Sequence, residues 1–190
     1  MENKFFNFFQ PYFDFIDSGK FFRTPFKYLY MLLAAVNILF PLYVLYEALD
    51  NKIFDAPGKI VFAFFLLWLV LLVAGWLSFQ LWWNRSGKVD KVSSPSDDFV
   101  AIPVYSHFIQ TFGEYIGSWI ACVGTIFGII TVLFEGSESL RSLLSVFPLG
   151  EGGVGTIVQS LVTGFVVIVG FRVVAELLRG IVSIANNTKR

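Results

Sequence analysis

Cysteine, histidine and charged residues are all scarce in this chain of 190 residues. The single cysteine, Cys122, lies inside an apolar run, so no intrachain disulfide can form and a small buried packing side chain is expected there. With one cysteine and one histidine, neither a zinc site nor a Cys–His dyad is expected. Charged residues make up 15% of the chain and the formal net charge is zero, which gives no indication of nucleic-acid binding.

Apolar and aromatic residues take the place of the missing charge. Hydrophobic residues make up 56% of the chain and aromatic residues 18%, including 23 Phe, and the mean hydropathy is +0.69. About a quarter of the residues in an ordinary soluble domain are charged. A chain this short also buries too small a fraction of its surface to hide so much apolar area from water. We therefore expect an integral membrane protein.

Four apolar runs are each long enough to cross a bilayer, which takes about 20 residues. They cover approximately residues 28–46, 60–83, 115–134 and 154–171 and contain no charged residue. Backbone groups must be paired inside lipid, so each run is expected to form a helix. The predicted fold class is an all-α integral membrane protein with four transmembrane helices, an N-terminal interfacial helix and a C-terminal amphipathic extension.

Proline and polar clusters predict where these helices begin and end. Thr24 is expected to cap the first one, with Pro25 at its first position, and Pro41 is expected to kink it. Pro103 permits the third helix to begin about ten residues before its apolar run. One membrane domain is assigned to residues 24–190.

The connections of this domain are predicted from the same pattern. A cytoplasmic loop is expected at 84–112 and an outer loop at 135–153. Residues 1–23 are rich in Phe and Tyr interleaved with polar side chains, a pattern typical of the headgroup boundary. They are expected to form an interfacial aromatic arm, or alternatively an arm that docks a partner.

Lys and Arg predict the orientation, because they concentrate in cytoplasmic segments. The N-terminal segment, the loop after the second run and the C-terminal tail carry eleven, and the opposite side carries three. The eleven are Lys4, Lys20, Arg23, Lys27, Arg85, Lys88, Lys91, Arg172, Arg179, Lys189 and Arg190. Both termini are therefore expected in the cytoplasm.

Small residues recur at helical spacing in the third span. They are Gly113, Gly117, Ala121, Gly124 and Gly128. Small residues at such spacing let two helix backbones approach closely in a membrane. We expect this face to pack against another helix, and in the first of the functions considered below that helix belongs to a second copy of the chain or to a partner protein.

Polar residues form a neighbouring stripe on the same helix. They are His107, Thr111, Glu114, Ser118 and Thr125. Steps of four, three and seven residues place them on one side of a helix. Because such a side is costly against lipid, it is expected to face protein, either in helix packing or along a water or ion path.

Charged residues at the predicted membrane edge are treated as functional candidates, because burying a charge in a membrane is energetically expensive. The candidates are Glu114, Arg172, Glu176 and Arg179. In the predicted topology Glu114 and Arg172 lie at similar depth, and we expect them to pair. Arg172 and Glu176 can instead pair along the helix, and both charges can instead extend into the headgroups.

The predicted outer loop contains a short amphipathic pattern. Ser137 is expected to cap it, and Leu140, Leu144 and Phe147 give it an apolar side. It is a candidate sensor or lid, or a simple connection.

Both ends of the chain resemble a family of small bacterial inner-membrane proteins catalogued only as a domain of unknown function. The similarity lies in residues 21–30, FFRTPFKYLY, and in residues 172–188, with their Arg…Glu…Ile-Ala-x-Asn-Thr pattern. The second and third spans depart from the family. The resemblance implies residence in the bacterial inner membrane and no known activity.

Three functions are compatible with these patterns. The first is a non-enzymatic inner-membrane subunit or scaffold that assembles through helix packing. The second is a small homo-oligomeric channel lined by the polar stripe, and the third is a membrane sensor or effector of a stress or phage-defence system. No catalytic residue, metal or cofactor is expected, because the chain contains no phosphate loop, metal spacing or HExxH motif. The expected partners are the lipid bilayer and a second copy or another membrane protein.

Overall fold

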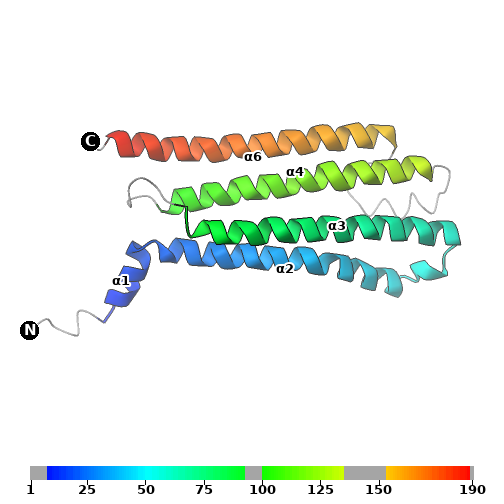
Figure 1. Cartoon of the computed structure of the whole chain (residues 1–190), viewed down its shortest axis with the longest axis horizontal. Helices are drawn as coiled ribbons and strands as arrows, with labels where there is room; N and C mark the ends of the chain where they lie inside the picture. The colour runs from blue at the N-terminus through cyan, green and yellow to red at the C-terminus, as the bar shows by residue number, and fades with distance from the viewer. Residues whose placement is uncertain (1–7, 93–99, 135–152, 189–190) are drawn as a thin grey trace, which may run out of the picture.

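The computed structural model describes residues 8–92, 100–134 and 153–188, and 91% of these residues are helical. Four long helices run side by side: α2 (Lys20–Asp50), α3 (Gly58–Val89), α4 (Ala101–Leu133) and α6 (Val154–Thr188) (Figure 1). A short helix α1 (Gln10–Asp17) precedes them, and a 3₁₀ turn η1 (Ile53–Asp55) joins α2 to α3. The predicted all-α membrane fold is confirmed.

All four long helices are apolar enough to cross a membrane. They contain 31 to 35 residues, which corresponds to about 46 to 52 Å at 1.5 Å per residue. The hydrocarbon core is only about 30 Å thick. The helices therefore extend beyond it, and the chain is a multi-pass membrane protein.

Most ends of the long helices lie beyond the predicted apolar runs, although α4 ends at Leu133 and α6 begins at Val154, as the runs themselves do to within one residue. α3 continues to Val89 and α4 begins at Ala101, so helix covers both ends of the segment 84–112 that was predicted as a loop. The early start near Pro103 and the helical extension past Arg172 were both predicted, and α6 continues to Thr188.

The N-terminal boundary differs from the prediction. α2 begins at Lys20, so Thr24 is not its cap and Pro25 lies inside the helix. The cap position is Gly19, whose φ of 71° turns the chain between α1 and α2. This left-handed conformation is easily adopted by glycine. Of the predicted aromatic arm, residues 20–23 belong to α2, and α1 has no buried residue.

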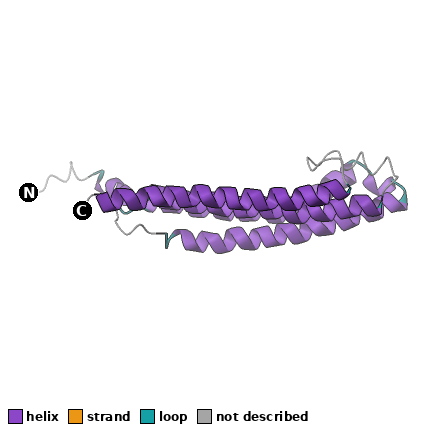
Figure 2. Ribbon diagram, turned by 90° about the horizontal axis from the view of Figure 1, so that it is seen from above, coloured by secondary structure: helices purple, strands orange, loops and turns teal. Residues whose placement is uncertain are grey.

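The bundle consists of two hairpins, α2 with α3 and α4 with α6, joined mainly by contacts between α3 and α4 (Figure 1). The main core joins Tyr30, Ala34, Trp82, Val89 and Val104. This core lies at the end of the bundle where α2 begins at Lys20, α3 ends at Val89, α4 begins at Ala101 and α6 ends at Thr188. We call it the network end, after the polar network described below. A smaller core of Ala63 and Phe127 lies toward the other end. All long helices remain nearly parallel when the bundle is turned (Figure 2).

Pro41 shapes the α2–α3 hairpin from inside α2. A proline cannot donate the helical hydrogen bond to the carbonyl four residues earlier, here Asn37. That carbonyl lies against α3, only 2.6 Å from where a Cβ at Gly75 would stand. Trp68 on α3 donates its Nε1–H to the Pro41 carbonyl at 2.9 Å. The two helices therefore make close contact at Gly75, and Trp68 supplies a hydrogen bond to the nearby Pro41 carbonyl.

Candidate functional site

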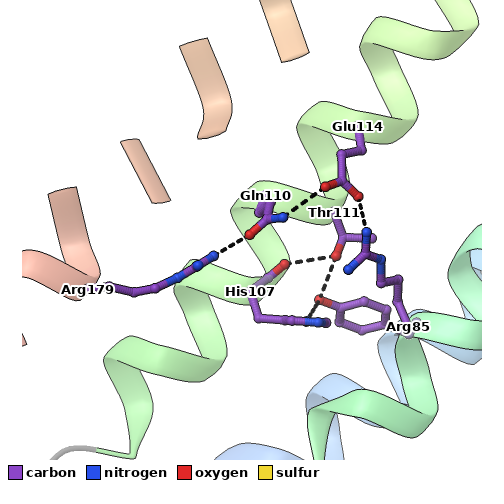
Figure 3. A network of polar contacts seen from close by, with 7 residues as sticks. Arg85, His107, Gln110, Thr111, Glu114 and Arg179 are labelled. Carbon is purple, nitrogen blue, oxygen red and sulfur yellow. Dashed lines mark hydrogen bonds and ion pairs between the residues drawn. The ribbon is translucent and has the colours of Figure 1, made fainter. Parts of the chain in front are cut away.

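A network of polar side chains joins the helices at the network end (Figure 3). It contains Arg85 from α3, a cluster from α4 and Arg179 from α6, and the hydroxyl of Tyr30 on α2 joins it. The α4 cluster is Ser106, His107, Gln110, Thr111 and Glu114. Three of these residues belong to the polar stripe predicted from the sequence.

An ion pair lies at the centre of this network. Arg85 Nη2 donates to Glu114 Oε2 at 2.5 Å, and their side chains are only 25% and 20% exposed. The other carboxylate oxygen of Glu114 accepts a hydrogen bond from Gln110 Nε2 at 2.8 Å. Both oxygens of the carboxylate are thus engaged. Removing one partner of a mostly buried charge pair leaves the other charge uncompensated, so the pair fixes α3 against α4.

A second group of contacts joins α4 to α6. Arg179 donates through Nε to Ser106 Oγ at 2.9 Å and through Nη2 to Gln110 Oε1. The fully buried Ser106 hydroxyl in turn donates to the Ala175 carbonyl at 2.8 Å. Arg179 is therefore a cation held by neutral acceptors of the neighbouring helix.

A third group is buried beside α2. The Tyr30 hydroxyl lies 2.8 Å from His107 Nδ1 and 3.5 Å from Thr111 Oγ1. Thr111 Oγ1 donates to the His107 carbonyl at 2.9 Å. The Tyr30 ring packs edge-on against Trp82, with ring centroids 5.2 Å apart. His107 Nε2 and Trp82 Nε1 are buried and have no hydrogen-bond partner among the described residues.

The predicted pair between Glu114 and Arg172 is wrong. Glu114 bonds Arg85 instead, and Arg172 lies 3.2 Å from Glu176, the alternative pair along the helix. The reason is the rotation of α6. Phe171 is the residue that faces α4, because a Cβ at Gly113 would overlap the Phe171 side chain. Arg172 and Glu176 consequently lie on an exposed face of α6.

The predicted polar stripe is divided in the structure. His107, Thr111 and Glu114 bond neighbours within the network. Farther along α4, Ser118 is exposed, whereas Thr125 has a buried hydroxyl with no partner among the described residues. α4 also lines an apolar hollow of about 190 Å³, and none of the residues that line it belongs to the polar stripe. Its lining residues are Tyr115, Ile116, Trp119, Ile120 and Val123.

The predicted small-residue face packs closely against a helix, but that helix is α6 of the same chain. A Cβ at Gly117 would stand 2.6 Å from the Gly164 carbonyl, and one at Gly128 would stand 2.7 Å from Ile157 Cγ1. Ala121 Cβ lies 2.7 Å from where a Cβ at Gly164 would stand. The fifth predicted residue, Gly124, is also buried. Since α6 covers this face, the expectation that it binds a second copy or a partner is corrected.

Cys122 is exposed on α4 rather than buried, because the packed faces of α4 lie to either side of it. The outer-loop candidates Ser137, Leu140, Leu144 and Phe147 lie outside the described residues. Among residues 8–92, 100–134 and 153–188, no three His, Cys, Asp or Glu side chains come together in a group that could hold a metal ion.

Sequence reasoning missed Tyr30, Arg85, Ser106 and Gln110 as members of the network. Arg85 had a usable signal, since it lies two residues after the second apolar run and at the depth of Glu114. Tyr30, Ser106 and Gln110 had none, because their importance depends on which helix is adjacent.

Compared with known proteins, the chain matches no protein-family model, no curated protein and no solved structure.

Proposed function

We propose that the protein is a non-enzymatic subunit or scaffold of the bacterial inner membrane, with both termini in the cytoplasm. The network supports this proposal most strongly. Its charged and polar groups bond one another across α2, α3, α4 and α6. Such contacts hold helices in fixed positions.

The distribution of Lys and Arg supports the orientation. The eleven residues of the predicted cytoplasmic side lie in the N-terminal segment, around the loop after α3, and in the last part of the chain. The helix ends of these regions are those of the network end. The network end is accordingly the cytoplasmic end in this proposal.

The experiment that tests the scaffold is a flux measurement on the purified full chain in liposomes. K⁺ and H⁺ flux is measured for the wild type and for Glu114→Gln, which removes a charge from the divided polar stripe. The scaffold predicts that neither protein raises flux above that of empty liposomes. A flux that the wild type carries and Glu114→Gln changes would overturn the scaffold in favour of the channel.

A stability measurement accompanies the flux measurement. In a scaffold the Arg85–Glu114 pair serves helix packing, so the double variant Arg85→Met, Glu114→Leu should remain folded and should bury apolar side chains in place of the pair. Thermal unfolding in detergent and circular dichroism report the result. Loss of helical structure in this variant would contradict a packing role that apolar residues can replace.

A further inference from the structure

α6 presents three faces along its length, each about a third of the helix circumference at about 100° per residue. The first packs on α4 through Thr156, Ser160, Gly164, Ala175 and Val182, which are all buried. The other two are exposed in the described structure. α6 lies at the edge of the bundle, next to α4 (Figure 1).

The second face has the composition expected of a helix that leaves a membrane for water. Between Val154 and Phe171 it carries large apolar residues, namely Val158, Leu161, Val162, Phe165 and Val169. From Arg172 onward it carries Arg172, Glu176, Arg179 and Ser183. In the proposed topology the first group lies in lipid and the second beyond the uncharged run, where Arg179 also bonds Ser106 and Gln110 on α4. We call this the charged face.

The third face, which we call the α6 stripe, has the opposite composition. Its first half is Gly155, Gln159, Thr163, Val166 and Gly170, which is mostly small or polar although it lies in the uncharged part of the helix. Its second half is Val173, Leu177, Ile181 and Ile184, which is wholly apolar although it lies beyond the first charge. Steps of three or four residues keep both halves on one side of the helix.

Neither lipid nor water is a favourable solvent for the half of the α6 stripe that would lie in it. All nine stripe residues are exposed, and Leu177 and Ile184 are 63% and 68% exposed. An amide such as Gln159 lacks hydrogen-bond partners in hydrocarbon, and exposed aliphatic side chains are unfavourable in water. Each half has the composition of a helix–helix interface in its own medium: small and polar residues within a membrane, and an apolar seam in water.

The space beside the stripe is open. A Cβ added at Gly155 or Gly170 would meet no atom of the described chain within 4 Å. This contrasts with the glycines of the α4–α6 contact, where an added Cβ would overlap the neighbouring helix. Another helix can therefore approach the stripe closely.

We infer that the α6 stripe is the contact between two copies of this chain, which pair with their α6 helices parallel about a two-fold axis along the membrane normal. The bilayer fixes the depth of each copy, so every stripe residue meets its own counterpart. The two halves are then self-complementary. A Gln159 amide both donates and accepts, so two of them can bond reciprocally, and Leu177, Ile181 and Ile184 meet the same apolar side chains.

Charge does not oppose a second copy. Parallel identical helices would repel if like charges met at the contact. Arg172, Glu176 and Arg179 lie on the charged face instead, about a third of a turn from the stripe. The contact therefore brings no like charges together. This inference deepens the proposed scaffold by naming its partner as another copy, and it rests on that proposal for its biological role.

Disulfide cross-linking of adjacent positions tests the contact. The full chain is used with Cys122→Ser, so that each variant has a single cysteine. Leu177→Cys and Ile184→Cys place it on the stripe, whereas Glu176→Cys and Ser183→Cys place it on the charged face one residue earlier. Membranes are oxidised with copper phenanthroline, and non-reducing gels show the fraction at twice 21.5 kDa.

The stripe positions are expected to give at least ten times more dimer than their neighbours. Equal cross-linking on both faces, no dimer at the stripe, or an adduct with a protein of another mass would each overturn the inference. A second measurement uses Ile184→Glu, which should weaken dimerisation in detergent at least ten-fold, with Ser183→Glu as the matched control. Helical content by circular dichroism confirms that both variants fold, and equal dimerisation by folded variants would also overturn the inference.

These outcomes are separate from the test of the scaffold. A negative cross-linking result removes the dimer and leaves the flux result unchanged. Ion flux would remove the scaffold and leave the cross-linking pattern unchanged.

Discussion

The two hairpins of the bundle are held together in different ways. In the α4–α6 hairpin, glycines allow close backbone contact from Gly113, opposite Phe171, to Gly128, opposite Ile157. In the α2–α3 hairpin, close contact is concentrated at Gly75, beside Pro41, and the indole N–H of Trp68 donates to the Pro41 carbonyl. Large side chains such as Tyr30 and Trp82 fill the rest of that contact at the network end.

This difference predicts different sensitivities. A hairpin packed through glycines has no room for an added methyl group, whereas one packed through large side chains loses most when a specific bond is removed. The Arg85–Glu114 pair lies where the two hairpins join. Variants in each hairpin and at the join therefore test whether the two hairpins are held together differently.

The largest effect is expected at the centre of the α4–α6 contact. In Gly164→Ala the new methyl would stand 2.5 Å from the Gly117 carbonyl and 2.9 Å from the Ala121 nitrogen. Overpacking of this kind costs about 1–3 kcal/mol, so the melting temperature in detergent should fall. Gly180→Ala is the matched control on the same helix, because its Cβ would meet no described atom within 4 Å. It should be neutral or stabilising by up to about 1 kcal/mol. Equal destabilisation of both variants would contradict the close packing.

The next effect is expected at the join. Glu114→Gln gives the Arg85 guanidinium a neutral amide oxygen in place of a carboxylate oxygen, and the lost negative charge is expected to cost about 1–1.5 kcal/mol, the difference between a charge-assisted and a neutral hydrogen bond. Glu176→Gln is the control, because the exposed Arg172–Glu176 pair contributes only about 0.2–0.5 kcal/mol. Chemical denaturation in detergent measures both. A Glu176→Gln variant as unstable as Glu114→Gln would show that burial does not distinguish the two pairs.

The smallest effect is expected in the α2–α3 hairpin. Trp68→Phe keeps an aromatic ring and loses the donor to the Pro41 carbonyl, a loss of about 0.5–1.5 kcal/mol. Trp76→Phe serves as the control, because the Trp76 side chain is largely exposed. The shift in unfolding midpoint of the two variants is compared. No difference between them would mean that the carbonyl bond does not hold this hairpin.

Most of the fold follows from composition, because the bilayer imposes one solution on a long uncharged run. Residues 60–83 and 154–171 can only be helices in lipid, and both lie inside the observed α3 and α6. The helix start at Lys20 was not predictable from Thr24 and Pro25, since those residues also suit a helix cap. The deciding feature is the left-handed conformation of Gly19.

The site was predictable in kind and not in pairing. Glu114, His107 and Thr111 were recognised because polar residues within a membrane helix need protein neighbours. Their partners depend on helix rotation and order, which single-helix periodicity does not specify. By depth alone, Arg85 and Arg172 were equally suitable partners for Glu114. The packing of Phe171 on Gly113 places Arg172 on another face of α6, away from Glu114. The same ambiguity assigned the small-residue face to a second chain rather than to α6.

Single-cysteine labelling shows whether the chain crosses the membrane four times with the network end in the cytoplasm. In the Cys122→Ser background, Asn51→Cys lies between α2 and α3, Lys91→Cys follows α3, and Asn187→Cys lies near the end of α6; all three positions are exposed. With a membrane-impermeant maleimide, Asn51→Cys should react in intact spheroplasts, and Lys91→Cys and Asn187→Cys only after permeabilisation. Labelling of all three positions from the same side, or of Lys91→Cys and Asn187→Cys from opposite sides, would contradict the account.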